Sequence, residues 1–374
     1  MASSSSDTPR ATLAADPLVG TLGMFIIDTF RVLDEASGAE MRDPLQRGEQ
    51  IGGGGVYFAV GARVWLRPER ILGVIDAGPD FPAALRNTLE AFNAAAGASS
   101  PSRGGMWAWR SRPDGTTRAV NVYRGQHRGF EYLSPRLRLE PSDIAACSPC
   151  GRLPRWLHCI CAPDRLLAIV AQLRQLRSDD MDAQRIVWEP IPDSATAQNL
   201  PALLEAMRHV HVVSPNHDEA AAFLSHPPDT LTSREACTAL VERLGAAFAH
   251  ASPEAKAPLI CVRCGALGAV ALGAQGVQAV QAWHRPEQAA SVVDVTGAGN
   301  AFLGGLTAAL SETAPDMLPV DLPQGAIRHA LSCAAVSASY ALEQLGLPSL
   351  SSGSAERWNG DEPSARLREL EGRR

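Results

Sequence analysis

The chain has 374 residues, of which 45% are hydrophobic and 20% charged, as in soluble globular proteins with one large domain or two ordinary ones. A net charge of -6 argues against nucleic acid as a partner, because a phosphate backbone requires a basic face. The sequence shows neither a run near the roughly 20 apolar residues that cross a bilayer nor the apolar core of a secretory signal. We therefore expect a cytoplasmic protein without a membrane partner.

Short apolar runs alternate with helical patterns along the chain. Residues 1–17 and 350–374 are polar and rich in Pro, Gly and Ser. We expect a disordered tail at the first and a polar C-terminal tail at the second, with one domain over residues 18–349. In chain order, the predicted strands are 22–30, 70–78, 155–162, 185–192, 211–216, 258–265 and 268–272, and the predicted helices are 51–66, 81–95, 163–176, 200–210, 218–224 and 324–345.

This alternation predicts an α/β fold with a mostly parallel central sheet and helices on both faces. Ligands then bind at the carboxyl ends of the strands. One stretch breaks the alternation: residues 106–125, "MWAWRSRPDGTTRAVNVYRG", read as a β-hairpin around a Pro-Asp-Gly turn. Residues 28–50 and 104–125 are expected to form a small β-lid that excludes water from a site.

The stretch "VVDVTGAGNAFLGG", residues 292–305, reads as a strand, a glycine turn and a helix start. Gly297 and Gly299 permit a tight turn, and the amides of Gly297, Ala298, Gly299 and Asn300 would point outward at the helix N-terminus. Unpaired amides together with the helix dipole make an anion site. The alternative is a glycine-rich helix start that serves only close packing.

Three further motifs are compatible with a ligand site or with plain structure. Asn216 and Glu219 lie three apart, so they form either a capping box or an acidic group near Mg²⁺. Gly265 and Gly268 bracket a tight turn between two strands, which needs no ligand. Four glycines, 52–55, precede a helix and imply a close approach of the backbone to something.

Asp28 ends an otherwise apolar predicted strand at the expected ligand edge. Its carboxylate would accept hydrogen bonds from sugar-type hydroxyls, or it would cap a turn.

The eight cysteines include two Cys-x-x-Cys pairs, Cys147/Cys150 and Cys261/Cys264. Together these could hold zinc. We favour reduced core thiols, because Cys261 lies in an apolar predicted strand and Cys159 and Cys161 lie in another.

The order of these motifs resembles the PfkB/ribokinase family of small-molecule kinases. "DVTGAGNAF" is similar to the family signature Asp-x-Thr-Gly-Ala-Gly-Asp-x-Phe, "NHDE" to its Asn-x-x-Glu, and "RCGALG" to its nucleotide turn. "GGGGVYFAVGAR" resembles the N-terminal Gly-Gly segment, and "LGVIDAGPDF" a second glycine segment. The resemblance covers about residues 18–349, and the fungal PfkB-like proteins named for maintenance of killer look like the nearest branch.

This resemblance implies a ribokinase-like three-layer α/β/α sandwich with a β-lid, and ATP with Mg²⁺ as phosphoryl donor. Residues 297–299 would form the anion hole, and Asp294 and Thr296 would serve that loop and a nearby monovalent cation site. Asn216, Glu219, Gly265 and Gly268 would border the nucleotide and the metal, with Glu219 reaching Mg²⁺ through water. Asp28, Gly52, Gly53 and Tyr57 would lie at the acceptor site.

Asn300 departs from the pattern, because the family carries there the aspartate that takes the proton of the attacking hydroxyl. An amide can hold a hydroxyl but cannot take its proton. Tyr57 replaces a substrate-side asparagine, Arg263 replaces a threonine in the nucleotide turn, and the acidic residues of "DAGPD" are displaced. Asn300 could also be a mild substitution, because Asn caps a helix as well as Asp does.

General-base help is worth about 10²–10⁴ in rate, whereas positioning and charge stabilisation carry most of phosphoryl transfer. We therefore predict retained nucleotide binding with slow or altered transfer to a hydroxyl of a sugar, nucleoside or similar molecule. Two other interpretations stay open: a pseudokinase that acts through partners, and a related fold with different chemistry on a phosphorylated ligand. An exposed lid edge would allow a homodimer through the lid.

Overall fold

The computed structural model describes residues 16–44, 48–94, 105–124, 127–176, 184–313, 315–353 and 355–373. Most of the predicted N-terminal tail, residues 1–15, lies outside this range. In the part of the chain that is described, no helix is long and apolar enough to cross a membrane.

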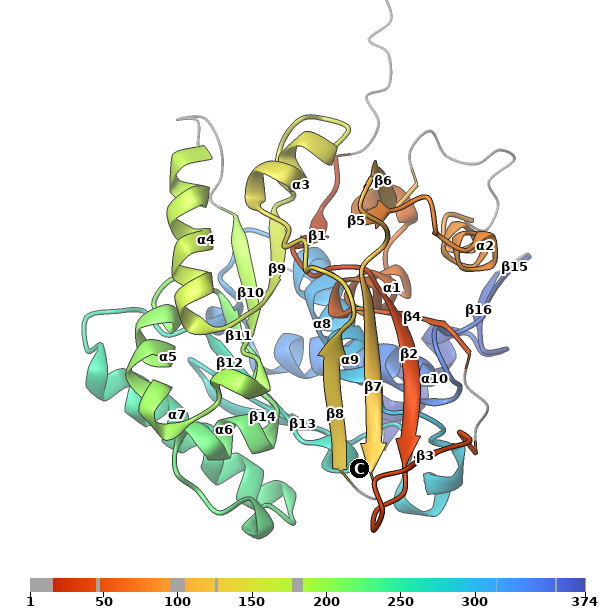
Figure 1. Ribbon diagram of the computed structural model, residues 1–374. Coiled ribbons are helices and arrows are strands. Elements are labelled where there is room, and N and C mark those ends of the chain that lie inside the picture. Colours follow the sequence, from red (N-terminus) through yellow and green to blue (C-terminus); the bar gives the residue numbers. More distant parts are fainter. Residues whose placement is uncertain are drawn as a thin grey trace, which may run out of the picture.

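A nine-stranded sheet forms the centre of the molecule, in the order β14-β13-β12-β11-β10-β9-β1-β5-β6 (Figure 1). Neighbours from β6 to β12 run parallel, whereas β13 and β14 are antiparallel additions at one edge. The strands are β1 (Val19–Thr21), β5 (Ile71–Ala77), β6 (Trp107–Ser111), β9 (Trp156–Ile160), β10 (Arg185–Glu189), β11 (Val212–Val213), β12 (Leu259–Arg263), β13 (Ala269–Gly273) and β14 (Gly276–Val280).

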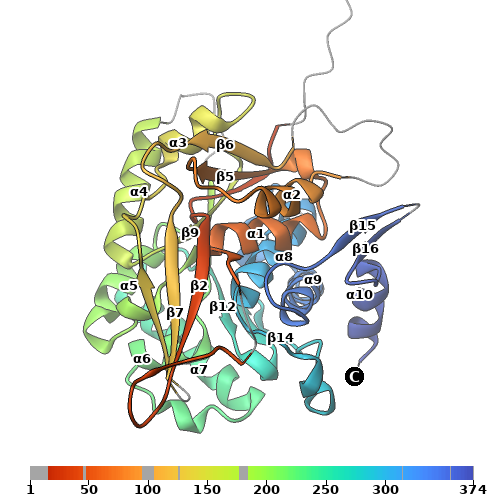
Figure 2. The same cartoon turned by 45° about the vertical axis from the view of Figure 1, so that its right-hand side comes forward.

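Helices cover both faces of this sheet, as its nearly continuous apolar strands require (Figure 2). One face carries α1 (Gly54–Arg63), α8 (Ala298–Thr313) and α9 (Gln324–Leu342), with α2 (Ala83–Ala91) near β6. The other carries α3 (Pro141–Cys147), α4 (Pro163–Leu176), α5 (Leu200–Met207), α6 (His217–Phe223) and α7 (Arg234–Ala251). The predicted three-layer α/β/α sandwich with a mostly parallel sheet is thus confirmed.

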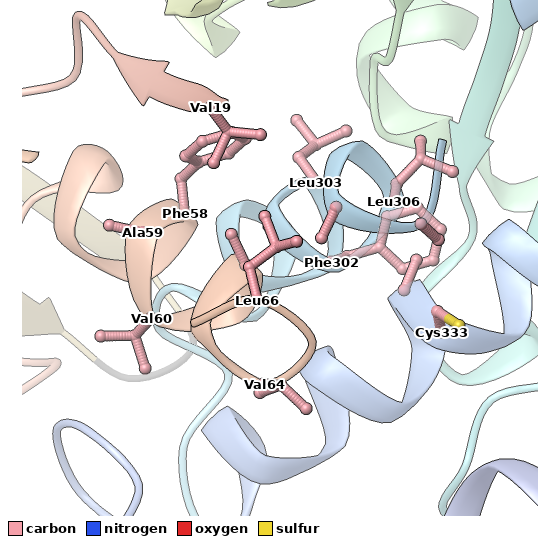
Figure 3. Close-up of a cluster of buried hydrophobic side chains, with 14 of the residues drawn as sticks. Val19, Phe58, Ala59, Val60, Val64, Leu66, Phe302, Leu303, Leu306 and Cys333 are labelled. Atoms are coloured by element: carbon pink, nitrogen blue, oxygen red, sulfur yellow. The ribbon is translucent and has the colours of Figure 1, made fainter. Parts of the chain in front are cut away.

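The core beneath α1 and α8 fixes where these two helices begin. Phe58 of α1 and Leu303 of α8 are fully buried, and they pack with Val19 of β1 in one apolar cluster that extends to Cys333 of α9 (Figure 3). Burying a side chain of this size stabilises the fold by roughly 1.5–3 kcal/mol. The N-termini of α1 and α8 are thereby held side by side at one end of the sheet.

A separate five-stranded sheet forms the lid over that end (Figure 1). It contains β2 (Ile26–Leu33), β3 (Glu40–Met41), β4 (Gln50–Gly52), β7 (Arg118–Arg124) and β8 (His127–Tyr132). Asp28 lies inside lid strand β2 rather than at the end of a core strand, because β1 stops at Thr21 and the chain turns before β2. The predicted strand over residues 22–30 was therefore misplaced.

The predicted hairpin over residues 106–125 is wrong. Its first half, β6, pairs parallel with β5 in the central sheet, while its second half, β7, joins the lid beside β2. Trp107 draws β6 into the core, where its indole N–H donates to Leu89 O at 2.7 Å and its side chain is buried. The Pro-Asp-Gly turn therefore connects two sheets instead of two paired strands.

The predicted C-terminal tail is also wrong for residues 350–353 and 355–373, which fold. They form the strand pair β15 (Leu350–Ser352) and β16 (Glu356–Trp358) and the helix α10 (Pro363–Gly372), which packs on α9. Trp358 is fully buried and Leu370 is nearly so. The composition of this segment is polar because the helix exposes most of its surface, so a composition window misses the few buried anchors.

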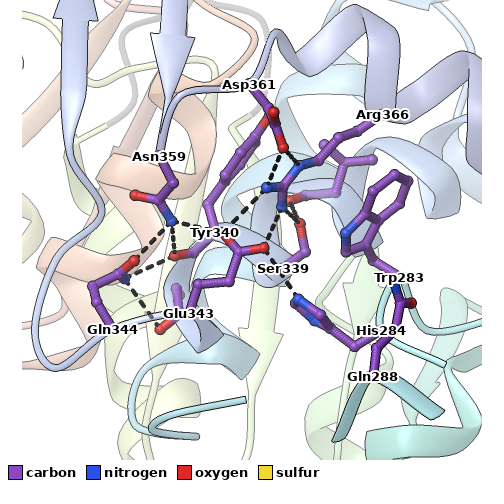
Figure 4. A network of polar contacts seen from close by, with 12 residues as sticks. Trp283, His284, Gln288, Ser339, Tyr340, Glu343, Gln344, Asn359, Asp361 and Arg366 are labelled. Atoms are coloured by element: carbon purple, nitrogen blue, oxygen red, sulfur yellow. Dashed lines mark hydrogen bonds and ion pairs between the residues drawn. The ribbon is translucent and has the colours of Figure 1, made fainter. Parts of the chain in front are cut away.

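Arg366 of α10 joins the C-terminal segment to α9 through a buried polar network (Figure 4). Its guanidinium pairs with Glu343 Oε1 at 2.7 Å and Asp361 Oδ2 at 2.7 Å, and it donates to Ser339 Oγ at 2.9 Å. The same group lies 4.1 Å from the centre of the Tyr340 ring. Arg366 thus ties α10 to the C-terminal end of α9.

The Glu343 carboxylate should make stability depend on acid pH. Burial raises its pKa, but hydrogen bonds from His284, Arg366 and Asn359 outweigh burial and lower it to about 2 from 4.5. Its contribution is therefore present above pH 4.5 and is lost as the pH falls toward 2. Between pH 7 and pH 3, wild type should lose about 1–2 kcal/mol more than Glu343→Gln, because solvent at this half-buried site reduces the effect of the full shift.

Urea unfolding of both proteins at several pH values measures this difference. Glu362→Gln, which changes an exposed carboxylate in the same segment, should follow wild type. Identical slopes for wild type and Glu343→Gln would contradict the role of the network.

Candidate active site

The carboxyl ends of five neighbouring parallel strands meet the N-termini of α1, α6 and α8 at one edge of the sheet. Strand ends and helix starts bring polar side chains and unpaired amides together there, which is the usual ligand position in such sheets. Thr21 ends β1, Glu189 ends β10, and Arg263 ends β12. Polar groups therefore gather at the carboxyl ends of the strands, where the strand–helix alternation predicts a ligand.

The glycine loop, residues 294–299, leads into α8 as predicted, but no strand precedes it. Residues 292–295 are irregular, and the amides of Val293 and Asp294 donate to Leu342 O at 2.7 and 3.2 Å at the end of α9. Val293 and Val295 are 49% and 66% exposed, so this apolar run is not a core strand. The backbone of this apolar stretch is therefore hydrogen-bonded to the end of α9 and not to a neighbouring strand.

Side chains within the loop set its shape. Asp294 Oδ1 accepts from the Thr296 amide at 3.0 Å and from the Thr296 hydroxyl at 2.9 Å. Gly297 has φ +76°, and a Cβ there would overlap the Tyr57 ring. Tyr57, expected at the acceptor site, is thus buried beneath the loop, where its ring supports the turn. The helix that follows leaves the amides of Gly299 and Asn300 without acceptors inside α8.

The Asn300 side chain does not stand alone. Its Nδ2 donates to Glu189 Oε2 at 2.5 Å. A Cβ on Gly54, the first residue of α1, would lie 3.1 Å from both polar atoms of the Asn300 amide, so glycine lets α1 start against this side chain. The amide therefore joins the starts of α1 and α8 to the end of β10.

Arg263 lies across the mouth of the glycine loop. Its guanidinium pairs with Glu189 Oε1 at 2.7 Å and Glu219 Oε2 at 3.6 Å, and it donates to Ser214 O at 3.0 Å. A Cβ on Gly299 would overlap Arg263 Nη1. A cation therefore faces the position that the sequence predicts as an anion hole.

His158 completes the cluster from β9. Its Nδ1 lies 2.9 Å from the Thr21 hydroxyl, and its Nε2 lies 3.6 Å from Glu189 Oε2. Phe58 stacks on the ring at 4.2 Å with planes 3° apart. Burial lowers the pKa of His158, so the imidazole is neutral at pH 7.

The two buried carboxyls of the cluster differ in charge. Burial raises the pKa of Glu189, but the Arg263 charge and the nearby His158 imidazole outweigh it, so the pKa lies below its usual value. Burial raises the pKa of Glu219 to about 7, because Arg263 is more distant from it. Glu189 is therefore the ionised partner of Arg263 at neutral pH.

Asn216 and Glu219 form the reciprocal capping box of α6. Asn216 Oδ1 accepts from the Glu219 amide at 2.7 Å, and Glu219 Oε2 accepts from the Asn216 amide at 2.8 Å. Among the described residues, no three acidic, histidine or cysteine side chains cluster as a metal site. Magnesium usually takes only one or two protein carboxylates beside water and phosphate, so Glu219 alone is compatible with it.

A cavity of about 610 Å³ opens beside this cluster. Its lining includes the polar side chains of Asn216 and Arg263, the backbone of Gly299, and the apolar Ala335, Ala338 and Leu342 of α9. Gly265 and Gly268, which bracket the predicted turn between β12 and β13, lie on its wall. A cavity of this size with a mixed polar and apolar lining is suited to a nucleotide.

The C-terminal segment supports this cavity from behind. Trp283, His284 and Ser339 line it, and Figure 4 shows Trp283, His284 and Ser339 next to Arg366 and Glu343 of the C-terminal network. His284 Nε2 lies 3.1 Å from Glu343 Oε1. The fold of residues 355–373 thus shapes the predicted nucleotide site.

Asp28, Gly52 and Gly53 come together on the lid side. Asp28 is 5% exposed, and a Cβ on Gly52 would overlap its carboxylate. Gly53 has φ +92°, and a Cβ there would overlap Met24 O, so both glycines are required for the chain to pass β2 closely. The predicted acceptor residues other than Tyr57 are therefore adjacent.

Sequence reasoning missed Glu189 and His158. Glu189 carried a usable signal, because it ends the apolar run "RIVWE" as an acidic residue, the same pattern that singled out Asp28. His158 gave none, since an isolated histidine inside an apolar strand is usually a core residue. All eight cysteines are free thiols, and Cys159, Cys161, Cys261 and Cys264 are buried, as the core interpretation predicted.

Two curated fungal proteins are similar to this chain over most of its length. Protein MAK32 of Saccharomyces cerevisiae is 25% identical over 361 residues, 92% of this chain and 89% of that protein. An uncharacterized protein of Schizosaccharomyces pombe is 28% identical over 371 residues, 93% of this chain and 91% of that protein. These matches are consistent with the fungal branch that the motifs indicated.

Solved structures of kinases share the fold. Ribokinase of Arabidopsis thaliana, complexed with ribose and ATP, is 14% identical with a TM-score of 0.56, covering 89% of this chain and 94% of that one. Phosphofructokinase-2 of Escherichia coli, in complex with potassium, is 14% identical with a TM-score of 0.57, covering 96% of this chain and 100% of that one. At such identity the likeness concerns the fold alone.

The family model described as pfkB family carbohydrate kinase matches residues 162–351, just over half of the chain. That stretch contains the capping box, the nucleotide turn and the glycine loop. The chain belongs to the pfkB family of carbohydrate kinases.

Proposed function

We propose that this protein transfers a phosphoryl group from ATP to a hydroxyl of a sugar, nucleoside or similar small molecule. The observation that carries the proposal is the cavity of about 610 Å³ that is lined by the start of α8, Arg263 and Asn216. Family membership supports kinase-type chemistry. Asp28 of lid strand β2, Gly52 of lid strand β4 and the adjoining Gly53 supply the acceptor side.

Each part of the site has a role in this proposal. The amides of residues 297–299 stabilise the moving phosphoryl group, and Arg263 adds a guanidinium, the usual partner of phosphate oxygens. Bound Mg²⁺ would neutralise charge on the phosphates, with Glu219 and Asn216 holding it through water. A monovalent cation near Asp294 and Thr296 would stiffen the glycine loop.

Two features favour a second candidate, a pseudokinase that binds nucleotide or sugar and acts through partners. Asn300 cannot accept a proton. Arg263 and Glu189 also satisfy each other across the predicted anion hole, so that phosphate must compete for the guanidinium. In the first candidate, the same features make transfer slow or altered.

Calorimetry with ATP–Mg²⁺ and turnover against a panel of sugars and nucleosides separate the two, using wild type and Asn300→Asp. Turnover in wild type supports the kinase. Binding in both proteins with turnover only in Asn300→Asp supports the pseudokinase. Absence of ATP binding in both would refute the kinase proposal.

Filling the part of the cavity that α9 lines should weaken nucleotide binding. Ala338 is half-buried on the cavity wall, and phenylalanine there would occupy the space proposed for the base. We expect Ala338→Phe to weaken ATP binding at least about tenfold, which is 1.4 kcal/mol. His329→Phe, on the exposed side of the same helix, should bind ATP like wild type. Equal affinity in all three proteins would place the nucleotide elsewhere.

Two further proposals concern the whole molecule. Phe130 and Leu133 are 48% and 56% exposed at the β8 edge of the lid, which supports a homodimer formed through the lid. Phe130→Glu with Leu133→Glu should then shift sedimentation to a monomer. We also propose a cytoplasmic location, which fluorescence of a tagged chain would test.

A further inference from the structure

Position 300 lacks a carboxylate, but another residue places a carboxylate beside it. Glu189 comes from a different strand, yet its Oε2 lies 2.5 Å from the Asn300 amide nitrogen. The Glu189 side chain is 9% exposed and lies at the carboxyl end of β10, beside the glycine loop. A carboxyl group is therefore present within one hydrogen bond of the residue that replaces the family aspartate.

Thr21 and His158 help to orient the Glu189 carboxylate. Gly23 N donates to the Thr21 hydroxyl at 2.9 Å, which leaves that hydroxyl free to donate to His158 Nδ1. The neutral imidazole then carries its proton on Nε2, toward Glu189 Oε2. His158 thus acts as a positioning residue that fixes the carboxylate, while the Phe58 stack fixes His158.

Arg263 contacts both Glu189 and the glycine loop, so a phosphate bound at the loop would affect the Glu189 carboxylate. Its guanidinium lies against Gly299 and holds Glu189 Oε1 at 2.7 Å. A phosphate bound at the loop would share this guanidinium, because Arg prefers planar contacts with phosphate oxygens. The pairing of Arg263 with Glu189 then weakens, and the basicity of the Glu189 carboxylate rises when the donor is bound.

We propose that Glu189 is the catalytic base of this protein: it accepts the proton of the acceptor hydroxyl, while Asn300 orients that hydroxyl. This inference rests on the proposed kinase function and deepens it. It assigns the base to strand β10, outside the glycine motif in which the family carries it.

The step balances within the groups named. The acceptor O–H bond breaks, and its proton goes to the Glu189 carboxylate. The acceptor oxygen forms a bond to the terminal phosphorus of ATP, and the bond from that phosphorus to the bridging oxygen breaks, with its electron pair leaving on ADP. The carboxylic acid then returns its proton to water as the products leave.

Moving the carboxylate between the two positions tests the proposal. We would compare wild type, Glu189→Gln, Asn300→Asp and the double variant Glu189→Gln/Asn300→Asp, measuring ADP formation from ATP–Mg²⁺ with the sugar and nucleoside panel and with water alone. Glu189→Gln should lower the rate about 10²–10⁴-fold. The double variant, which carries the carboxylate at position 300, should recover at least about tenfold over Glu189→Gln.

A pH profile separates a base from a merely structural residue. The groups that face Glu189 are His158, Arg263 and Asn300, with Glu219 beyond Arg263. Burial keeps His158 neutral, and Glu219 is present in every variant. Glu219, with its pKa of about 7, therefore gives every variant an acid limb, and in wild type this limb should steepen as the pH falls further and Glu189 takes up a proton. The steeper part should be absent from Glu189→Gln and return, at a shifted pH, in the double variant.

Two control variants separate loss of the catalytic base from loss of the folded state. Glu205→Gln, which removes an exposed carboxylate of α5, should keep the wild-type rate. If Glu189→Gln does not fold, Glu189→Asp keeps the charge for Arg263, and its rate should still fall because the carboxylate withdraws from Asn300.

Several results would overturn the inference. Turnover in wild type that is unchanged in folded Glu189→Gln or Glu189→Asp refutes the base assignment alone and leaves the kinase proposal standing. ATP binding in wild type with turnover only after Asn300→Asp also refutes it. Absence of ATP binding in every variant refutes the kinase proposal and the inference together.

Discussion

Arg263→Met is expected to destabilise the protein by about 3–5 kcal/mol, because it leaves the ionised Glu189 buried without its cation. Both side chains are largely enclosed, at 12% and 9% exposure, and they meet at 2.7 Å. An unpaired carboxylate in such a site must either stay charged at high cost or take up a proton. The Arg263→Met protein should therefore also regain stability as the pH falls through the raised pKa of Glu189.

A double-mutant cycle identifies the cause. Adding Glu189→Gln to Arg263→Met removes the buried charge, so the double variant should be more stable than Arg263→Met alone. Arg208→Met breaks an exposed pair with Glu205, in which both side chains are about half exposed, and should cost no more than about 1 kcal/mol. Urea unfolding at pH 7 measures the four proteins of the cycle, which include Glu189→Gln alone, and the Arg208→Met control. A loss in Arg263→Met no larger than in Arg208→Met would mean that Arg263 and Glu189 do not pair in solution.

Trp358→Ala should destabilise the protein by a similar amount, about 3–5 kcal/mol, as large-to-small changes of buried aromatic residues do. The Trp358 side chain is fully buried between Phe92 and Tyr340, with ring centres 5.7 and 6.1 Å away. Losing it should also loosen α10 from α9, and with it the Arg366–Ser339 contact at the wall of the cavity. We therefore expect weaker ATP binding as well as a lower melting temperature.

Arg357→Ala is the matched control, since Arg357 precedes Trp358 on β16 but its exposed side chain pairs with Glu362 and donates to Gly360 O at 3.2 Å, outside the core. It should change stability by less than about 0.5 kcal/mol. Thermal unfolding and calorimetry with ATP–Mg²⁺ report the two effects separately. If Trp358→Ala melts like Arg357→Ala, the C-terminal segment does not pack on the domain as described.

Local patterns were sufficient for the α/β architecture. The apolar runs that became β5, β9, β10 and β12 are each followed by helical periodicity or a glycine turn, and those signals depend only on neighbouring residues. The glycine loop and the capping box were also predicted, because their residues lie within a few positions of each other. Family resemblance added the proposed role of each motif.

Long-range packing decided what local patterns could not. Residues 106–124 read as a hairpin, but Trp107 packs against α2, and β6 pairs with β5 instead of with β7. Residues 355–373 read as a tail, because four anchors, Trp358, Asp361, Arg366 and Leu370, are dispersed among exposed charges. In both cases the partner that decided the outcome lies far away in the chain.

The sequence by itself determined the sheet, the two helical layers, the glycine loop and the absence of a carboxylate at position 300. Only the tertiary structure decided what surrounds that position. Glu189, His158 and Arg263 end or lie within three different strands, separated by 31 residues or more in sequence, and no local pattern relates them. They meet because parallel strands align their carboxyl ends at one edge, so a carboxylate lost from one element can be replaced from another.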